Sequence, residues 1–146
     1  MRKARIKPKR GKKTVPRATL IRKLKKKADV EWSLAVRKRD GGCCQVEGCG
    51  RSPSFAHHIF SRRHLATRWD MGNGFTICWG HHKKGHVDHE WLRDEIIKKI
   101  GEPEFGRLKE LANQTVYDLS DMELEDIIKN LRGINTTTMI ERREIF

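Results

Sequence analysis

Long apolar runs are absent from this chain of 146 residues. No stretch approaches the ~20 consecutive apolar residues that a membrane-spanning helix needs, and no apolar segment typical of a secretory signal peptide follows the basic N-terminus. We therefore expect a cytoplasmic protein that does not insert into a membrane. In a reducing compartment, its four cysteines indicate metal binding rather than disulfide bonds.

Acidic residues are absent from residues 1–27, which hold fourteen of the 32 Lys and Arg side chains. The formal net charge of +13 is therefore concentrated at one end of the chain. A block of like charge repels itself, stays solvated and suits a polyanion. Because each neutralised phosphate releases counterions, binding to nucleic acid should weaken steeply with salt. A tail that serves only solubility or localisation is the alternative.

The remaining pattern predicts an α+β fold with mostly helical N- and C-terminal segments around a short strand–loop–strand–helix core. Apolar residues at helical spacing, with Trp32 as a core anchor, indicate a helix before residue 40. Strands are expected over 55–60 and 75–78, and a capping-box pattern at Ser120 predicts a late helix. We divide the chain into a disordered basic tail (1–17), a helical lead-in (18–40), a core (41–100), C-terminal helices (101–133) and a tail (134–146).

The chemistry is concentrated in the core, because all four cysteines and all seven histidines lie between residues 43 and 89. Thiolates and imidazoles gathered in one short segment are the ligands that a borderline-soft metal selects. Two pairs separated by a loop, Cys44-x4-Cys49 and Cys78-x2-His81, can close a tetrahedral site and predict a structural zinc ion. Cys43 is the alternative to Cys44, and free buried cysteines are the alternative to a metal.

A second group of polar residues has a different spacing. His82 and His86 are four residues apart and share one helical face, which suits one metal ion but also occurs on an exposed polar helix. His57 and His58 are adjacent on a predicted strand, so their side chains should point to opposite faces. One histidine can then bind a metal while its neighbour stays free as a base. Hydrolysis of a phosphodiester needs this division of roles.

Together with Asn73, these residues resemble the HNH (ββα-metal) endonuclease motif with its zinc knuckles, over about residues 37–90. The resemblance implies a small zinc-stabilised ββα-metal core with flanking helices. It also implies a general base, a residue that orients that base, and one catalytic divalent ion (Mg2+, Mn2+, Ni2+ or Zn2+). The implied roles are His58 as base, Asn73 as orienting residue, and His57, His82 and His86 as metal ligands.

General chemistry agrees with these implied roles. A neutral imidazole, with an ordinary pKa of about 6.5, is available as a base at physiological pH. Three histidine ligands leave coordination positions open for phosphate and water. Ligation by nitrogen alone favours a transition metal over Mg2+ in binding strength.

A narrower similarity links the chain to phage recombination endonucleases of the NinG/Rap type, which act on branched DNA. It is carried by residues 23–29, 36–41, 67–73 and 97–101. The chain departs from that type in its Cys-x4-Cys spacing and in ending the motif with histidines. The similarity implies a phage-encoded enzyme that acts in DNA recombination, repair or packaging in the cytoplasm of a bacterial host.

Basic residues near the motif are expected to position phosphates, although each taken singly is also ordinary surface charge. They are Arg62, Arg63, Arg68, Lys83 and Lys84. We expect His64 to contact phosphate or solvent, and His89 to lie on the surface. The leading expectation is a DNA endonuclease. The alternatives are a non-catalytic zinc-stabilised DNA-binding module and a ribonuclease.

Overall fold

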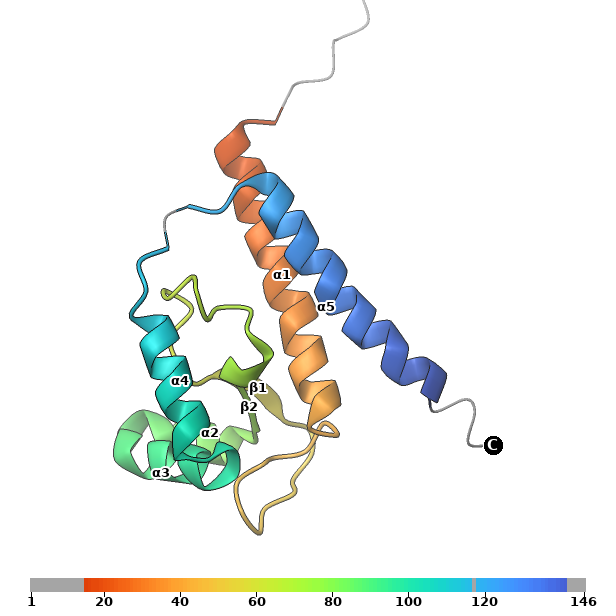
Figure 1. The fold of residues 1–146 in the computed structure, drawn as a ribbon. Helices are drawn as coiled ribbons and strands as arrows, with labels where there is room; N and C mark the ends of the chain where they lie inside the picture. The colour runs from red at the N-terminus through yellow and green to blue at the C-terminus, as the bar shows by residue number, and fades with distance from the viewer. Residues whose placement is uncertain (1–14, 117, 142–146) are drawn as a thin grey trace, which may run out of the picture.

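The computed structural model describes residues 15–116 and 118–141. Most of the basic tail expected over 1–17 therefore lies outside the described residues, as do residues 142–146. Helix α1 lies between α5 on one side and a small two-stranded sheet with three shorter helices on the other (Figure 1). The expected α+β class is confirmed. The elements are α1 (Arg17–Arg39), β1 (Phe55–His58), the 3-10 turn η1 (Met71–Asn73), β2 (Gly74–Ile77), α2 (Trp79–Val87), α3 (His89–Ile100), α4 (Glu102–Ala112) and α5 (Asp121–Glu141).

Helix α1 buries one stripe of side chains at helical spacing. Leu24, Ala28 and Trp32 follow one another at intervals of four residues, and all three are buried. Leu20 and Leu34, which the sequence pattern suggests for the same stripe, are instead 38% and 45% exposed. Leu34 is only two residues from Trp32, which turns it to the opposite side of the helix.

Helix α5 covers that stripe and begins at the predicted capping box. The Ser120 hydroxyl accepts a hydrogen bond from the Glu123 N–H, and the Ser120 N–H donates to the Glu123 carboxylate at 2.8 Å. Leu124, Ile128 and Leu131 are buried against α1. The helix continues to Glu141 and so includes residues 134–141 of the segment expected as a tail.

The two strands pair in antiparallel register, with Phe55 opposite Ile77 and His57 opposite Phe75. Strand β1 ends at His58, two residues earlier than expected, because the Asn73 side chain satisfies the backbone of Phe60. Strand β2 is buried along its whole length. A Cβ on Gly74 would collide with the side chain of Val36, so this glycine allows β2 to lie directly on α1.

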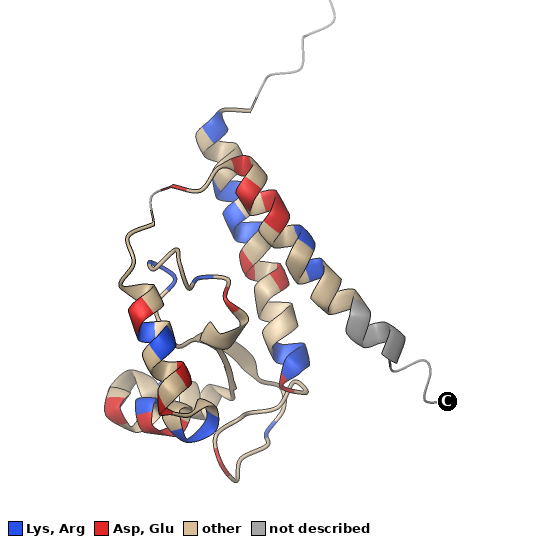
Figure 2. Ribbon diagram, in the orientation of Figure 1, with Lys and Arg blue, Asp and Glu red and all other residues tan. Residues whose placement is uncertain are grey.

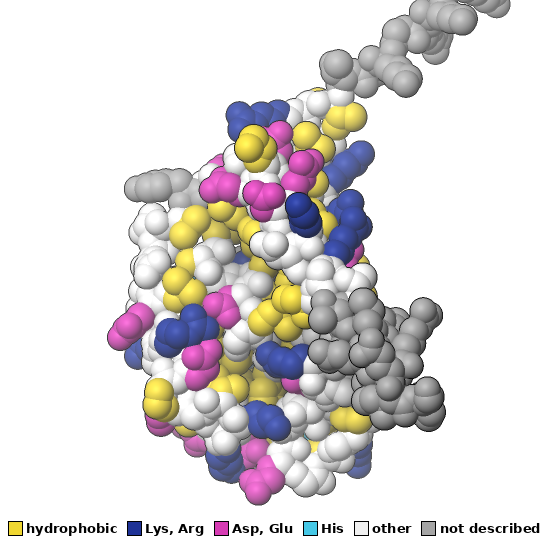
Figure 3. Space-filling model, turned by 45° about the vertical axis from the view of Figure 1, so that its right-hand side comes forward, with side chains coloured by type: hydrophobic (Ala, Val, Ile, Leu, Met, Phe, Trp, Pro, Cys, Tyr) yellow, Lys and Arg dark blue, Asp and Glu magenta, His cyan; other side chains and the backbone are white. Residues whose placement is uncertain are grey.

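The sheet separates two clusters of buried side chains. One lies between α1 and α5, and the other joins Phe75 and Ile77 to α3 and to two of the cysteines. The face of the molecule in Figure 3 carries Lys and Arg mixed with Asp and Glu, and no described His is visible on it. Among the described residues, no helix is both long and apolar enough to cross a membrane.

Candidate metal centre and histidine groove

Three cysteines and one histidine converge between the first loop and the start of α2. The ligand atoms of Cys44, Cys49, Cys78 and His81 all lie within 4.8 Å of one another. Cys44 Sγ is 3.4 Å from His81 Nδ1, and Cys49 Sγ is 4.0 Å from Cys78 Sγ. A tetrahedron with Zn–S bonds of about 2.3 Å has edges of roughly 3.8 Å. The four residues are therefore close enough to hold a metal ion, as predicted.

Local backbone geometry explains this convergence. Gly48 and Gly50 adopt φ values of +72° and +56°, which side chains with a Cβ rarely adopt. They let the chain fold back, so that the Cys49 N–H donates to the Val46 carbonyl at 3.1 Å. Cys78 is the N-cap of α2, and His81 follows within the first turn of that helix. The knuckle and the helix start therefore present two ligands each.

The structure distinguishes the two adjacent cysteines. Cys44 is buried and faces the cluster, whereas the Cys43 thiol contacts the Gly41 carbonyl at 3.5 Å. Burial raises the pKa of the Cys44 thiol to about 11. Burial also acts to raise the pKa of Cys78, but hydrogen bonds from the His81 N–H and the neighbouring thiols outweigh it, and the net shift is downward. The lowered pKa favours binding of Cys78 as a thiolate.

A groove of about 640 Å³ opens on the other side of α2. The four histidines expected to do chemistry, His57, His58, His82 and His86, all line it, and His86 is exposed. Asn73, expected with them, is not among its lining residues. The lining includes residues from α1, β1, the following loop and α2: Asp29, Trp32, His57, His58, Arg62, His82 and His86.

Three of these histidines are neighbours in the groove. The His82 ring centroid is 5.4 Å from that of His57 and 4.6 Å from that of His86, and both contacts are edge-to-face. His82 Nδ1 is buried and has no hydrogen-bond partner among the described residues. An orphaned buried nitrogen beside two further imidazoles fits a metal ligand. Within residues 15–116 and 118–141, however, only the Cys3His set forms a group close enough to hold a metal as it stands.

His58 lines the same groove but makes no ring contact with those three histidines among the described residues. Its ring stacks on the Trp32 indole, with centroids 3.7 Å apart and planes 16° apart. His58 Nε2 lies 3.0 Å from the Arg68 carbonyl oxygen. Because a carbonyl can only accept, Nε2 carries the proton and Nδ1 keeps its lone pair.

Burial also keeps these imidazoles neutral. It lowers the pKa of His58 to about 4, although the Arg68 carbonyl and Asp29 act in the opposite direction. The pKa of His57 is likewise lowered to about 4, by burial and by the neighbouring histidines His82, His58 and His86. Burial and the proximity of His86 lower the pKa of His82. Neutral rings can accept a proton or a metal ion.

Asn73 is fully buried and acts on the loop rather than on a ring. Its Oδ1 accepts from the Phe60 N–H at 2.7 Å, and its Nδ2 donates to the carbonyls of Phe60 and Thr67, both at 3.0 Å. Arg68, whose carbonyl holds His58, follows Thr67 directly. Asn73 therefore fixes the loop that orients His58.

A carboxylate that the sequence did not single out completes this support. Asp29 on α1 accepts two hydrogen bonds from Arg68, at 2.9 and 2.8 Å, and one from the Trp69 indole at 2.9 Å. Arg68 is thus paired with Asp29 rather than free for phosphate. The partners are about forty positions apart in sequence, and no local pattern reveals such a pair.

The other basic and imidazole side chains are placed as follows. Arg62 lines the groove and Arg63 is exposed. Lys83 lies over the Trp79 ring at 5.9 Å, and Lys84 over Trp91 at 3.7 Å.

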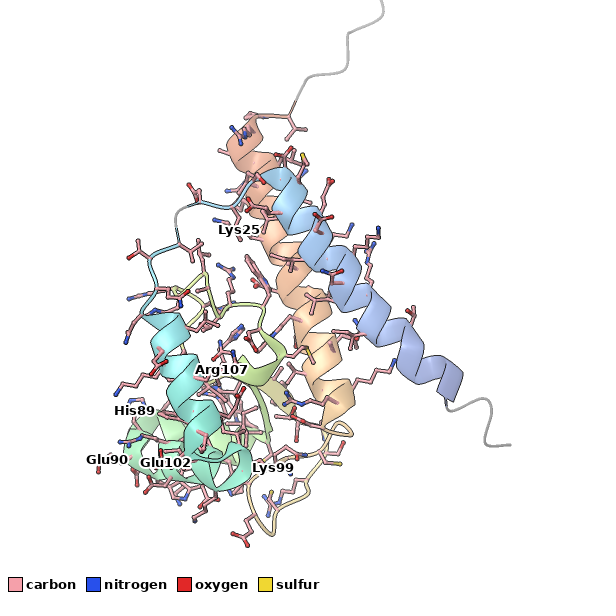
Figure 4. The ribbon with its side chains drawn as sticks, viewed as in Figure 1. Lys25, His89, Glu90, Lys99, Glu102 and Arg107 are labelled. Atoms are coloured by element: carbon pink, nitrogen blue, oxygen red, sulfur yellow. The ribbon has the colours of Figure 1, made fainter. Side chains whose placement is uncertain are left out.

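His89 lies on the surface, as expected (Figure 4). The expectation for His64 was incomplete, because its Nδ1 bonds to the Ala112 carbonyl at 2.9 Å.

No family model, curated protein or solved structure matches this chain. The functional argument therefore rests on the geometry of the Cys3His cluster and the histidine groove.

Proposed function

We propose that this protein is a metal-dependent endonuclease of the HNH type that hydrolyses phosphodiester bonds in DNA. One observation carries the proposal: a neutral imidazole with a fixed tautomer, His58, lines the same open groove as three clustered histidines. A general base next to a set of metal-binding side chains is what hydrolysis of a phosphodiester needs. The narrower proposal is a phage-encoded enzyme of DNA recombination, repair or packaging.

His58 is suited to accept a proton from the attacking water at Nδ1. The Trp32 stack fixes the plane of the ring, and the Arg68 carbonyl fixes its tautomer. Once protonated, the imidazolium is stabilised by the charge of Asp29, which acts on His58 across the groove. Trp32, Asp29 and Asn73 act through other groups, so they are positioning residues.

The donor set of His57, His82 and His86 fits a divalent ion. The pKa values of His57 and His82 are lowered, so both rings are unprotonated at neutral pH, and His82 Nδ1 has no other partner among the described residues. When bound, such an ion would offset negative charge on the attacked phosphate and on the leaving oxygen.

The Cys3His cluster supports the same proposal in a structural role. Cys78 and His81 lie in the first turn of α2, and His82 and His86 follow on the same helix. A zinc ion there would tie the knuckle to this helix and so fix the angle at which two of the groove histidines are presented. Trp91 packs on His81, with ring centroids 5.4 Å apart.

Positive charge near the groove fits a polyanionic substrate. A second groove, of about 650 Å³, is lined by basic side chains of α1 and shares Asp29 with the histidine groove. Arg17, Arg22 and Lys26 line it and form no ion pair among the described residues. Contacts of this kind to phosphate position a nucleic acid without reading its sequence.

One observation favours a second candidate, a non-catalytic zinc-stabilised DNA-binding module. Among the described residues, only the Cys3His group is close enough to hold a metal as it stands. If the groove histidines bound no ion, the basic surface and the zinc knuckle would still serve DNA binding.

Cleavage assays separate these candidates. Purified protein is incubated with linear, nicked, flap and four-way DNA, and with a matched RNA, in Mg2+, Mn2+, Ni2+ or Zn2+. We expect divalent-dependent cutting of DNA that His58→Ala reduces by about 100-fold or more, while DNA affinity stays within twofold. His89→Ala, which removes an exposed histidine outside the groove, is the matched control and should cut normally. Binding without cutting would select the DNA-binding module, and cutting of RNA alone would select a ribonuclease.

A further inference from the structure

Two exposed aromatic side chains lie next to the histidine groove, Trp79 at the start of α2 and Phe55 at the start of β1. Trp79 is 61% exposed and Phe55 is 49% exposed, and their rings meet edge-to-face at 6.4 Å. The Trp79 ring is nearly parallel to that of His82, at 14°, with centroids 5.9 Å apart. The aromatic pair therefore lies beside His82, one of the proposed metal ligands.

Packing within the protein does not account for Trp79. Trp32 and Trp69 are buried, at 1% and 8% exposure, and each donates an indole hydrogen bond. Trp91 packs on the metal-cluster residue His81. Among the described residues, Trp79 is the one tryptophan whose ring is mostly exposed, and no hydrogen bond holds its indole.

The surroundings of Trp79 indicate what covers it. The Lys83 ammonium lies 5.9 Å from the Trp79 ring centroid, and Arg62 lines the histidine groove. An exposed aromatic face combined with basic side chains suits a nucleic acid strand, whose bases offer flat faces and whose phosphates are negative. A strand with its phosphate at His57 and His82 would bring the adjacent base to the aromatic pair.

We propose that Trp79 and Phe55 form a stacking platform for an unpaired nucleobase next to the phosphodiester that is cut. In a continuous duplex the faces of each base are covered by its neighbours, so only a base at an overhang, flap or junction can stack on a side chain. This inference rests on the proposed nuclease function, and it names the substrate class as DNA with a single-stranded or splayed nucleotide at the cut. Phe55, edge-on to Trp79, holds the indole in place.

Binding measurements test this stacking platform. They use the full-length His58→Ala variant, which is expected to leave the DNA intact. The probes are a flap DNA with 2-aminopurine at the unpaired position and a blunt duplex of the same length. Because stacking of one base on an aromatic side chain changes affinity by roughly 5- to 150-fold, Trp79→Ala should weaken flap binding by that factor. Duplex affinity should stay within twofold, and quenching of 2-aminopurine should be lost.

Three further variants sharpen the result. Trp79→Phe keeps a stacking ring and should restore most of the flap preference. Val87→Ala removes the other exposed apolar side chain of α2, which is 89% exposed, and should change nothing. Lys83→Ala should weaken binding of both probes alike, because a phosphate contact does not distinguish them.

Two outcomes would overturn the proposed stacking platform. In one, Trp79→Ala leaves flap affinity and quenching unchanged, which would assign the aromatic pair to another partner such as a protein. In the other, flap and duplex lose affinity equally. Failure of the nuclease proposal looks different: the wild-type chain would cut no DNA while Trp79 still governed flap binding. Conversely, if the wild-type chain cut DNA but showed no flap preference that depends on Trp79, only the stacking platform would be contradicted.

Discussion

At the scale of single residues, His58 shows how a ring acquires a chemical role from its surroundings. The Trp32 indole covers one face of the ring, and the Arg68 carbonyl accepts a hydrogen bond from the only ring N–H. Arg68 in turn is held by Asp29. The free lone pair on Nδ1 is thus a consequence of three residues that do not take part in the proposed reaction. This arrangement makes the pH dependence of the proposed reaction predictable.

We predict that cleavage persists well below the ordinary pKa of histidine. A base works in its deprotonated form, and burial lowers the pKa of His58 to about 4, so activity should be lost only as pH falls toward that value. A cation bound nearby would lower this pKa further, which strengthens the direction of the effect. The measurement is kcat/KM against pH with saturating Mn2+, with circular dichroism at each pH to verify that the chain is folded.

The matched control is Asp29→Asn, which keeps the shape of the side chain but removes the charge that favours protonated His58. For this variant, the acidic limb of the plot of kcat/KM against pH should move to still lower pH. An acidic limb centred near pH 6.5 in the wild-type chain would contradict the assignment of His58 as a buried base.

At the scale of elements, the sequence predicted best what depends on near neighbours in the chain. The capping box at Ser120, the Cys44-x4-Cys49 knuckle and the histidines of α2 are each set by spacing within one or two turns. The predicted Cys3His set does converge in the structure. The pairing of Asp29 with Arg68, and the extension of α5 past residue 134, depend on contacts between distant segments. Spacing carries no information about them.

We predict that one zinc ion per chain is bound at this cluster and that it stabilises the start of α2. Cys78→Ser should lose the ion and lower the melting temperature, because it removes a thiolate ligand. Serine is itself a favourable N-cap, so the loss reports on the metal rather than on the start of the helix. Cys43→Ser is the matched control, since the Cys43 thiol lies outside the cluster and only contacts a backbone carbonyl. Zinc content by atomic absorption and melting by circular dichroism give the two readouts. Equal zinc content and equal melting temperatures in the two variants would contradict the proposed metal centre.

At the scale of the whole molecule, charge is segregated between the two long helices. The N-terminal half of α1 is basic, and the first turns of α5 beside it are acidic (Figure 2). Lys25 pairs with Asp118 at 3.2 Å, so part of the positive charge is used within the fold. Arg22 and Lys26 face the α1 groove without an ion pair among the described residues. This groove shares Asp29 with the histidine groove, so its basic side chains form a path that leads toward the proposed site.

We predict that this path, together with the basic residues before it, sets the salt dependence of DNA binding. Each phosphate contact contributes a slope of about −0.9 to log affinity against log salt for duplex DNA. Neutralising both Arg22 and Lys26 with alanine should therefore reduce the slope by roughly 1.8, and deletion of residues 1–14 should reduce it further. Lys99→Ala is the matched control, because Lys99 lies at the opposite end of the molecule from Lys25 and the α1 groove (Figure 4). Fluorescence anisotropy between 50 and 300 mM KCl measures the slopes. If the Arg22 and Lys26 double variant kept the wild-type slope while the deletion reduced it, the DNA would follow the N-terminal segment but not the α1 groove.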